Sequence, residues 1–210
     1  MTPTAQTPYL SPLEHDFLCE MFNLGVGNAA SSLSKMVNQE VHLSVPIVEL
    51  KTRNEMAVEL GQGVPICSVT QAMSGPFTAQ SMLLFPADSG LNVVRAMLNT
   101  HVSDEMLAEL QHEALSEIGN VVLNACIGSI ANTVSSNFKV GLPSFDISNP
   151  EELLKVAENQ QDDVVLLIRI FMTLSESKVT GYLAFVLGNV SLQELRNNLN
   201  SLLDELSVGH

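Results

Sequence analysis

Basic side chains are scarce in this chain of 210 residues. It contains 9 Lys and Arg against 23 Asp and Glu, which gives a formal net charge of −14 at pH 7. Proteins that bind nucleic acid neutralise its phosphates with Lys and Arg, and docking on anionic membranes uses the same two residues. The composition therefore argues against both kinds of partner.

Cysteines and long apolar runs are also few. Cys19, Cys67 and Cys126 are odd in number and widely spaced, which is typical of buried thiols in a reducing compartment and argues against a disulfide framework. No run approaches the roughly 20 uninterrupted apolar residues that span a bilayer, and Met1 to Leu10 lacks the features of a signal peptide. We therefore expect a cytoplasmic protein without membrane insertion.

Two segments of the chain share one pattern. Glu20-Met21-Phe22-Asn23 is followed after twenty-two residues by Pro46, and Glu117-Ile118-Gly119-Asn120 is followed after twenty-two residues by Pro143. The offset is 97 at Glu, at Asn and at Pro, so the two segments align without a gap. This spacing indicates an internal duplication.

A second similarity supports the duplication, because Thr78 to Leu84 resembles Thr180 to Val186 at an offset of 102. An apolar share of 46% with only 15% charged residues is that of a folded chain. We expect one domain over residues 12–206, made of repeats at about 12–100 and 103–206, with loose termini at 1–11 and 207–210.

Each half predicts a long helix, then strands, then a shorter helix. Leu13, Phe17, Met21 and Leu24 recur at helical spacing in the first long helix, Ser103 is suited to cap the second, and Ser191 with Glu194 forms a capping-box pattern. The fold class expected is α+β, internally duplicated and pseudo-twofold, with long helices packed on an antiparallel sheet. The strand candidates are Val41 to Val45, Val64 to Met73, Ala79 to Phe85, Val164 to Leu174 and Thr180 to Leu187.

A narrow polar stripe follows one face of each long helix. Asp16, Glu20 and Asn23 are spaced i, i+4 and i+7, and the second half repeats this spacing with Glu113, Glu117 and Asn120, which Asn124 extends by one turn. Asn is a poor helix former, so its recurrence at one place in a duplicated helix points to function. Two structural alternatives stay open: a solvated helix face, or Asn23 and Asn120 bonded to each other across the symmetry axis.

These residues resemble a known family. The pattern Asp/Ser-x3-Glu-x2-Asn-x22-Pro, present twice, is similar to that of the CheC/CheX/FliY family of response-regulator phosphatases. The first copy, from Asp16 to Pro46, matches in full, and Gly25 to Ala30 resembles the Gly-rich continuation of the family. The second copy matches at Glu117, Asn120 and Pro143, whereas Glu113 replaces the leading Asp or Ser. In the first copy Met21-Phe22 stands where Ile-Gly is more usual.

The resemblance implies hydrolysis of the aspartyl phosphate on a CheY-like chemotaxis response regulator. Asn23 and Asn120 would position the water, since an amide offers both a donor and an acceptor without charge. Glu20 and Glu117 would grip a lysine of the partner. The expected supporting residues are Asp16 and Glu113 beside the stripe, and Pro46 and Pro143, which would shape a bend.

The same resemblance implies no cofactor in this chain, because the regulator brings its own phosphoaspartate and Mg²⁺. A CheD-like chemoreceptor deamidase is a further partner known in the family. The alternative from another class is a non-catalytic binding module of the chemotaxis or flagellar-switch apparatus. Loss of Glu or Asn would mark such a module, and since both pairs are retained here, the phosphatase is favoured.

Other chemistries are less well supported by the sequence. His15, Asp16, Cys19 and Glu20 crowd two helical turns, but no second His/Cys pair completes a tetrahedral metal site. No Gly-x-Ser-x-Gly elbow or Walker-type phosphate loop occurs in the chain. We therefore expect no metal site of the protein's own.

Overall fold

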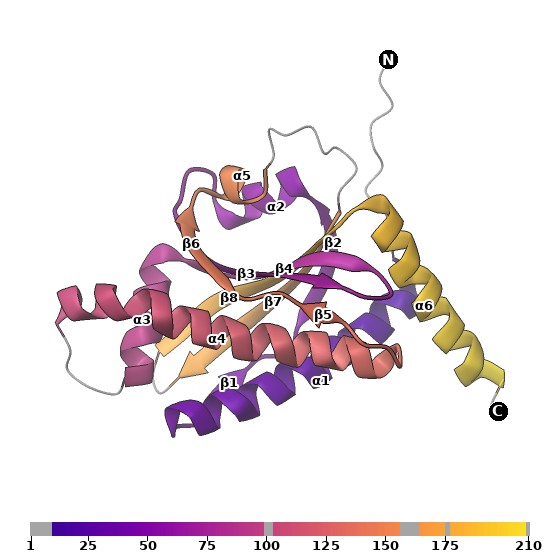
Figure 1. Cartoon of the computed structure of the whole chain (residues 1–210), viewed down its shortest axis with the longest axis horizontal. Coiled ribbons are helices and arrows are strands. Elements are labelled where there is room, and N and C mark those ends of the chain that lie inside the picture. The colour runs from indigo at the N-terminus through magenta and orange to yellow at the C-terminus, as the bar shows by residue number, and fades with distance from the viewer. Residues whose placement is uncertain (1–9, 99–102, 156–163, 175–176, 209–210) are drawn as a thin grey trace, which may run out of the picture.

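The computed structural model describes residues 10–98, 103–155, 164–174 and 177–208. These residues form an eight-stranded antiparallel sheet with helices on both of its faces (Figure 1). The predicted α+β class with an antiparallel sheet is confirmed. The helices are α1 (Pro12–Val37), α2 (Arg53–Leu60), α3 (Ala87–Leu98), α4 (Asp104–Thr133), α5 (Pro150–Leu153) and α6 (Asn189–Val208).

The strands fall into two equivalent sets. The order helix, strand, strand, helix, strand, strand, helix runs from α1 to α3 and again from α4 to α6, which agrees with the duplication expected from the sequence. The first set consists of β1 (Val41–Leu43), β2 (Ile47–Thr52), β3 (Ile66–Ser74) and β4 (Thr78–Pro86); the second consists of β5 (Lys139–Val140), β6 (Ser144–Ser148), β7 (Val164–Leu174) and β8 (Ser177–Leu187).

The halves exchange strands within one sheet. The strand order is β1-β7-β8-β4-β3-β5, with β2 also on β7 and β6 also on β3. The short strands of the first half therefore pair with the second half, and those of the second half pair with the first. At the centre β4 pairs with β8, so the two halves form a single structural unit.

The sheet carries an apolar core on each face. The larger core lies against α1, α3 and α4, and the smaller one lies under α2 on the opposite face (Figure 1). α1 and α4 pack directly on each other, and Gly25 allows their close approach. A Cβ atom on Gly25 would lie 3.0 Å from the Cα atom of Cys126.

Several local predictions need correction. The structure adds β2, β5, β6 and α2, which the apolar periodicity did not reveal. α6 begins at Asn189, so Ser191 is not its N-cap; the Ser191 hydroxyl instead accepts a hydrogen bond from the backbone N–H of Thr78. Leu13 and Leu24 are exposed, because α1 turns Leu18, Met21, Phe22 and Val26 inward.

The two predicted tails are described only in part. Ser11 caps α1 and α6 continues to Val208, whereas residues 1–9 and 209–210 lie outside the described part of the chain. The segment Glu109–Thr133 of α4 is long and apolar enough, by length and composition, to cross a membrane. Half of its most apolar stretch is buried in the structure, as expected for a core helix packed on α1 and the sheet.

Candidate functional site

The first site consists of Asp16, Glu20 and Asn23 on α1, with Pro46 nearby in sequence on the β1–β2 connection. A capping box fixes the start of this helix: the Ser11 hydroxyl accepts from the Glu14 N–H at 3.2 Å, and the Glu14 carboxylate accepts from the Ser11 N–H at 2.7 Å. Glu14 is buried and also accepts from Arg196 of α6 at 2.9 and 3.1 Å. The pairing with Arg196, together with the Ser11 bonds, lowers the pKa of Glu14 to about 2. The helix that carries the stripe is thus fixed at its beginning.

The stripe of the first site faces solvent. Asp16, Glu20 and Asn23 are all exposed, while Met21 and Phe22 between them are buried. Asp16 lies 3.5 Å from the His15 ring. Within the described part of the chain, Glu20 and Asn23 make no side-chain hydrogen bond or ion pair. Both side chains are therefore available to an incoming partner.

The second site consists of Glu113, Glu117 and Asn120 on α4, with Pro143 on the β5–β6 connection. The predicted N-cap is confirmed, since the Ser103 hydroxyl accepts from the Met106 N–H at 3.3 Å. Glu113 and Glu117 are exposed and Asn120 is half-buried. An open hollow of about 570 Å³ lies beside them, lined by His112, Glu113, Ser116, Glu117 and Pro143. Two stripe residues, Glu113 and Glu117, thus line one surface depression together with Pro143.

The two asparagines differ in their surroundings. The Asn120 side-chain oxygen accepts from Gln71 Nε2 of β3 at 3.2 Å and from Asn124 Nδ2 at 2.7 Å. Asn23 has no equivalent contacts among the described residues. The hypothesis that Asn23 and Asn120 bond to each other is wrong, because no hydrogen bond joins these two described residues.

In the first copy Met21-Phe22 stands in place of Ile-Gly, and the packing of the two helices explains this difference. Gly119, in the second copy, lies directly on β3: a Cβ atom there would be 2.4 Å from Val69 Cγ1. Phe22 takes the corresponding place in the first copy and packs on Phe185 of β8, with ring centroids 5.5 Å apart. A glycine brings α4 against the sheet, whereas a phenylalanine fills the space beneath α1.

Both prolines mark a break in a strand. β1 and β2 pair with the same strand, β7, and Pro46 lies between them; β5 and β6 both pair with β3, and Pro143 lies between them. Proline cannot donate to a ladder, so it suits the interruption between two strand segments. Pro46 is buried and Pro143 is half-buried.

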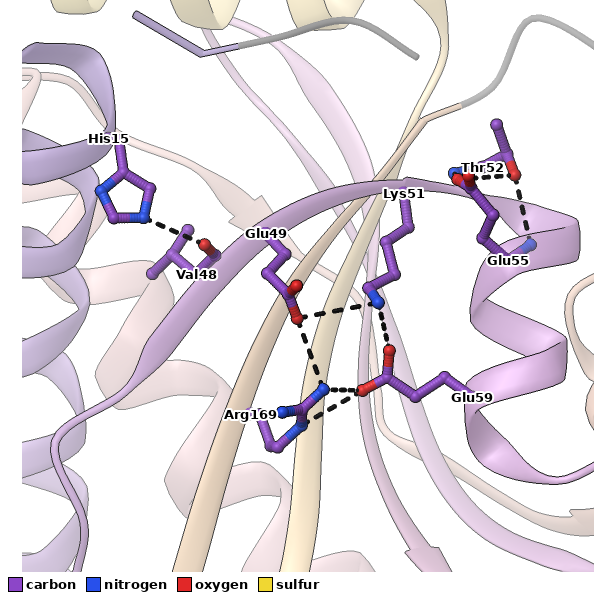
Figure 2. Close-up of polar contacts among 8 residues, drawn as sticks. All are labelled: His15, Val48, Glu49, Lys51, Thr52, Glu55, Glu59 and Arg169. Carbon is purple, nitrogen blue, oxygen red and sulfur yellow. Dashed lines mark hydrogen bonds and ion pairs between the residues drawn. The ribbon is translucent and has the colours of Figure 1, made fainter. Parts of the chain in front are cut away.

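Of the four residues weighed as metal ligands, three make other contacts: His15, Asp16 and Cys19. His15 Nε2 lies 3.2 Å from the Val48 carbonyl oxygen, which links α1 to β2 (Figure 2). Cys19 Sγ lies 3.7 Å from the same ring, and burial raises the pKa of the Cys19 thiol, with the Asp16 charge adding to the effect. No group of three or more His, Cys, Asp or Glu that could hold a metal occurs among the described residues.

Sequence reasoning missed Gln71. The alternation Cys67, Val69, Gln71, Met73 places it among the inward-facing positions of β3, where it is 2% exposed. A polar residue in the apolar phase of a strand was the available signal. Its partner on α4 could not be read from the sequence, since 49 residues separate Gln71 from Asn120.

Comparison with curated proteins finds relatives in bacterial chemotaxis. The chain is 24% identical to the CheY-P phosphatase CheC of Bacillus subtilis over 165 residues, which are 74% of this chain and 79% of that protein. It is 26% identical to the flagellar motor switch phosphatase FliY of the same organism over 157 residues, which are 73% of this chain but only 39% of FliY. No family model matches the chain.

Solved structures share the fold. Thermotoga maritima FliY superposes with a TM-score of 0.73 at 18% identity, covering 93% of this chain and 100% of that one. A chain of the CheX–CheY–BeF3–Mg²⁺ complex from Borrelia burgdorferi gives a TM-score of 0.51 at 17% identity, covering 80% and 96%. The FliM middle domain from H. pylori gives 0.61 at 12% identity, covering 90% and 99%.

Proposed function

Since the chain belongs to the CheC/CheX/FliY family, we propose that it is a phosphatase that hydrolyses the aspartyl phosphate of a CheY-like response regulator in chemotaxis. The observation that carries the proposal is a Glu and an Asn on one surface face of each of two long helices, all exposed except the half-buried Asn120. A folded protein substrate can reach such a surface, whereas it could not enter a deep pocket. The protein would act in the cytoplasm, where response regulators are found.

In this proposal the asparagines act on the water. An acyl phosphate is already reactive and has a good leaving group, so the catalyst has to place a water in line with phosphorus more than it has to supply a strong base. A neutral amide can orient that water without repelling the phosphoryl oxygens. Asn23 is exposed on α1 and well placed for this role, and Asn120 is its counterpart on α4.

The glutamates would dock the regulator. Glu20 lies one turn before Asn23, and Glu117 lies one turn before Asn120, so each pair can contact one partner at two adjacent points. A charge-assisted hydrogen bond from a lysine ammonium to either carboxylate would fix the regulator's orientation. Asp16 and Glu113 would add contacts at the next turn, and Pro46 and Pro143 would shape the adjacent loops.

The metal of the reaction would come from the partner. The related CheX–CheY complex from Borrelia burgdorferi also contains BeF3 and Mg²⁺. This supports a Mg²⁺ ion that the regulator holds. The carboxylates of the two stripes would then contact the partner's lysine and not the metal.

A non-catalytic role is the second candidate, because the FliM middle domain also has this fold. Two double variants separate docking from chemistry. Asn23→Ala with Asn120→Ala should keep the affinity for a BeF3-activated regulator and lower the rate of phosphate release about 100-fold. Glu20→Gln with Glu117→Gln should weaken that affinity about tenfold or more.

The outcomes decide between the two candidates. Binding of the activated regulator without any acceleration of phosphate release by the unchanged protein would support the binding module. A double asparagine variant as active as the unchanged protein would contradict the assignment of Asn23 and Asn120.

A further inference from the structure

The two asparagines have different hydrogen-bonding capacity. An amide oxygen has two lone pairs, and those of Asn120 are both used, by Gln71 Nε2 at 3.2 Å and Asn124 Nδ2 at 2.7 Å. Asn120 can therefore offer N–H donors to a partner but not a free acceptor. Asn23 retains both a donor and an acceptor, since its side chain is exposed and makes no hydrogen bond within the described residues.

Two backbone carbonyls determine which way the side-chain amides of Asn120, Asn124 and Gln71 are oriented. Asn124 Nδ2 also donates to the Asn120 carbonyl oxygen at 2.8 Å, and Gln71 Nε2 also donates to the Gly141 carbonyl oxygen at 3.4 Å. A carbonyl can only accept, so both NH₂ groups must point as they do, and the side-chain oxygen of Asn120 must face them. Turning either amide over would place two acceptors against each other.

The first half lacks both holding residues. The position that corresponds to Asn124 at the offset of 97 is Gly27, where a Cβ atom would meet nothing within 4 Å. The inward-facing residues of β7, the counterpart of β3, are apolar and belong to the larger core: Leu166, Ile168, Ile170 and Met172. None of these four β7 residues can therefore bind the Asn23 amide as Gln71 binds that of Asn120.

We propose that the two sites are unequal, with Gln71 and Asn124 acting as positioning residues that hold the Asn120 oxygen inward, so that the first site carries most of the turnover and the second mainly docks the regulator. This rests on the proposed phosphatase function. A water that attacks phosphorus keeps a lone pair for the reaction if one of its hydrogens is held by an acceptor. Asn23 supplies that acceptor, whereas Asn120 supplies donors suited to phosphoryl oxygens.

The test uses the difference between Gly27 and Asn124. Gly27→Asn should install the same i, i+4 contact on Asn23 and lower the rate of phosphate release several-fold, whereas the control Gly27→Ala fills the same space without a donor and should leave the rate unchanged. In an Asn23→Ala background, Asn124→Ala should free one of the two lone pairs of the Asn120 oxygen and raise the remaining rate several-fold. Asn23→Ala alone should remove more activity than Asn120→Ala alone.

A second readout does not depend on turnover. Both carboxamide protons of Asn124 should exchange slowly with water in an NMR experiment, and Asn120→Ala should release one of them. Equal loss of activity in the two single alanine variants, or a fall in rate on Asn124→Ala in the Asn23→Ala background, would overturn the inequality of the sites.

Failure of the proposed function gives a different result. If the unchanged protein does not accelerate phosphate release at all, the phosphatase and the division of labour are both overturned, while slow exchange at Asn124 still shows that Asn120 is held. Fast exchange of both Asn124 protons would overturn the held oxygen whatever the activity.

Discussion

At the scale of single residues, Glu14 stabilises the fold in two ways. It is 3% exposed, completes the capping box of α1 and pairs with Arg196 of α6. These contacts lower the pKa of its carboxyl from 4.5 to about 2, which corresponds to about 3 kcal/mol of stability at neutral pH.

The first prediction concerns the pH dependence of that stability. A folded-state pKa below the unfolded value means that the stabilisation is complete above about pH 4.5 and is lost as the pH falls toward about 2. Glu14→Gln should therefore lower the free energy of unfolding by roughly 2–3 kcal/mol at pH 7, and by much less at pH 3. Denaturant titrations at the two pH values measure this difference.

The exposed Glu113 provides the control, and Glu113→Gln should change the free energy of unfolding by less than about 0.5 kcal/mol. An effect of Glu14→Gln that is equally large at pH 3 would contradict the account of the Glu14–Arg196 pair.

A second prediction at this scale concerns Gly119. Because a Cβ atom there would lie 2.4 Å from Val69 Cγ1, Gly119→Ala should force α4 away from β3 and destabilise the protein by roughly 1–3 kcal/mol. Gly128→Ala on the same helix meets nothing within 4 Å and should be neutral or stabilising by up to about 1 kcal/mol. Thermal unfolding of both variants gives the comparison.

Val69→Gly provides a background without the three atoms that this Cβ atom would meet, which are Val69 Cγ1, Cβ and Cγ2 at 2.4, 2.5 and 2.8 Å. In that background Gly119→Ala should destabilise the protein less than it does in the unchanged protein. If Gly119→Ala and Gly128→Ala change the unfolding temperature by the same amount, Gly119 does not pack directly on Val69 of β3.

At the scale of elements, an ion-pair network attaches α2 to the sheet. Glu59 of α2 contacts both Lys51 of β2 and Arg169 of β7, and Glu49 reaches the same two cations at 3.7 and 3.4 Å (Figure 2). The Glu59 side chain is 15% exposed and that of Glu49 is 39% exposed. Lys51 and Arg169 lower the pKa of Glu59 despite its burial.

Because Glu59 is more buried than Glu49, replacing it should cost more stability. Glu59→Ala should destabilise the protein by roughly 3 kcal/mol, because it leaves two partly buried cations with only the more exposed Glu49 as partner, whereas Glu49→Ala should cost less than about 1 kcal/mol. Denaturant titrations at low and high salt measure both. Equal losses in the two variants would show that Glu59 is not the centre of the network.

At the scale of the whole molecule, the sequence predicted what local spacing encodes. The long helices, five of the strands and the α+β class followed from apolar periodicity and from the repeated Glu, Asn and Pro positions. Three of the four short strands beside Pro46 and Pro143, namely β2, β5 and β6, did not, because they have few residues and obtain their partners from the other half of the chain. Strand exchange depends on contacts far apart in sequence, which periodicity does not report.

The candidate sites show the same limit. The sequence placed Glu20 with Asn23 and Glu117 with Asn120 on single helix faces, because positions three apart on a helix are neighbours. It could not show that Gln71 on another element binds Asn120, or that Asn23 has no such partner in the part of the chain that the structure describes. The difference between the two sites therefore emerges only from the packing of α4 on β3.

The most direct test of the account is the rate at which a phosphorylated CheY-type regulator loses phosphate in the presence of this protein. We expect the unchanged protein to accelerate the loss and the Asn23→Ala, Asn120→Ala double variant to return it to within a few-fold of the spontaneous rate. A double variant that still accelerates the loss as fast as the unchanged protein would contradict the central claim that the phosphatase activity depends on these two asparagines.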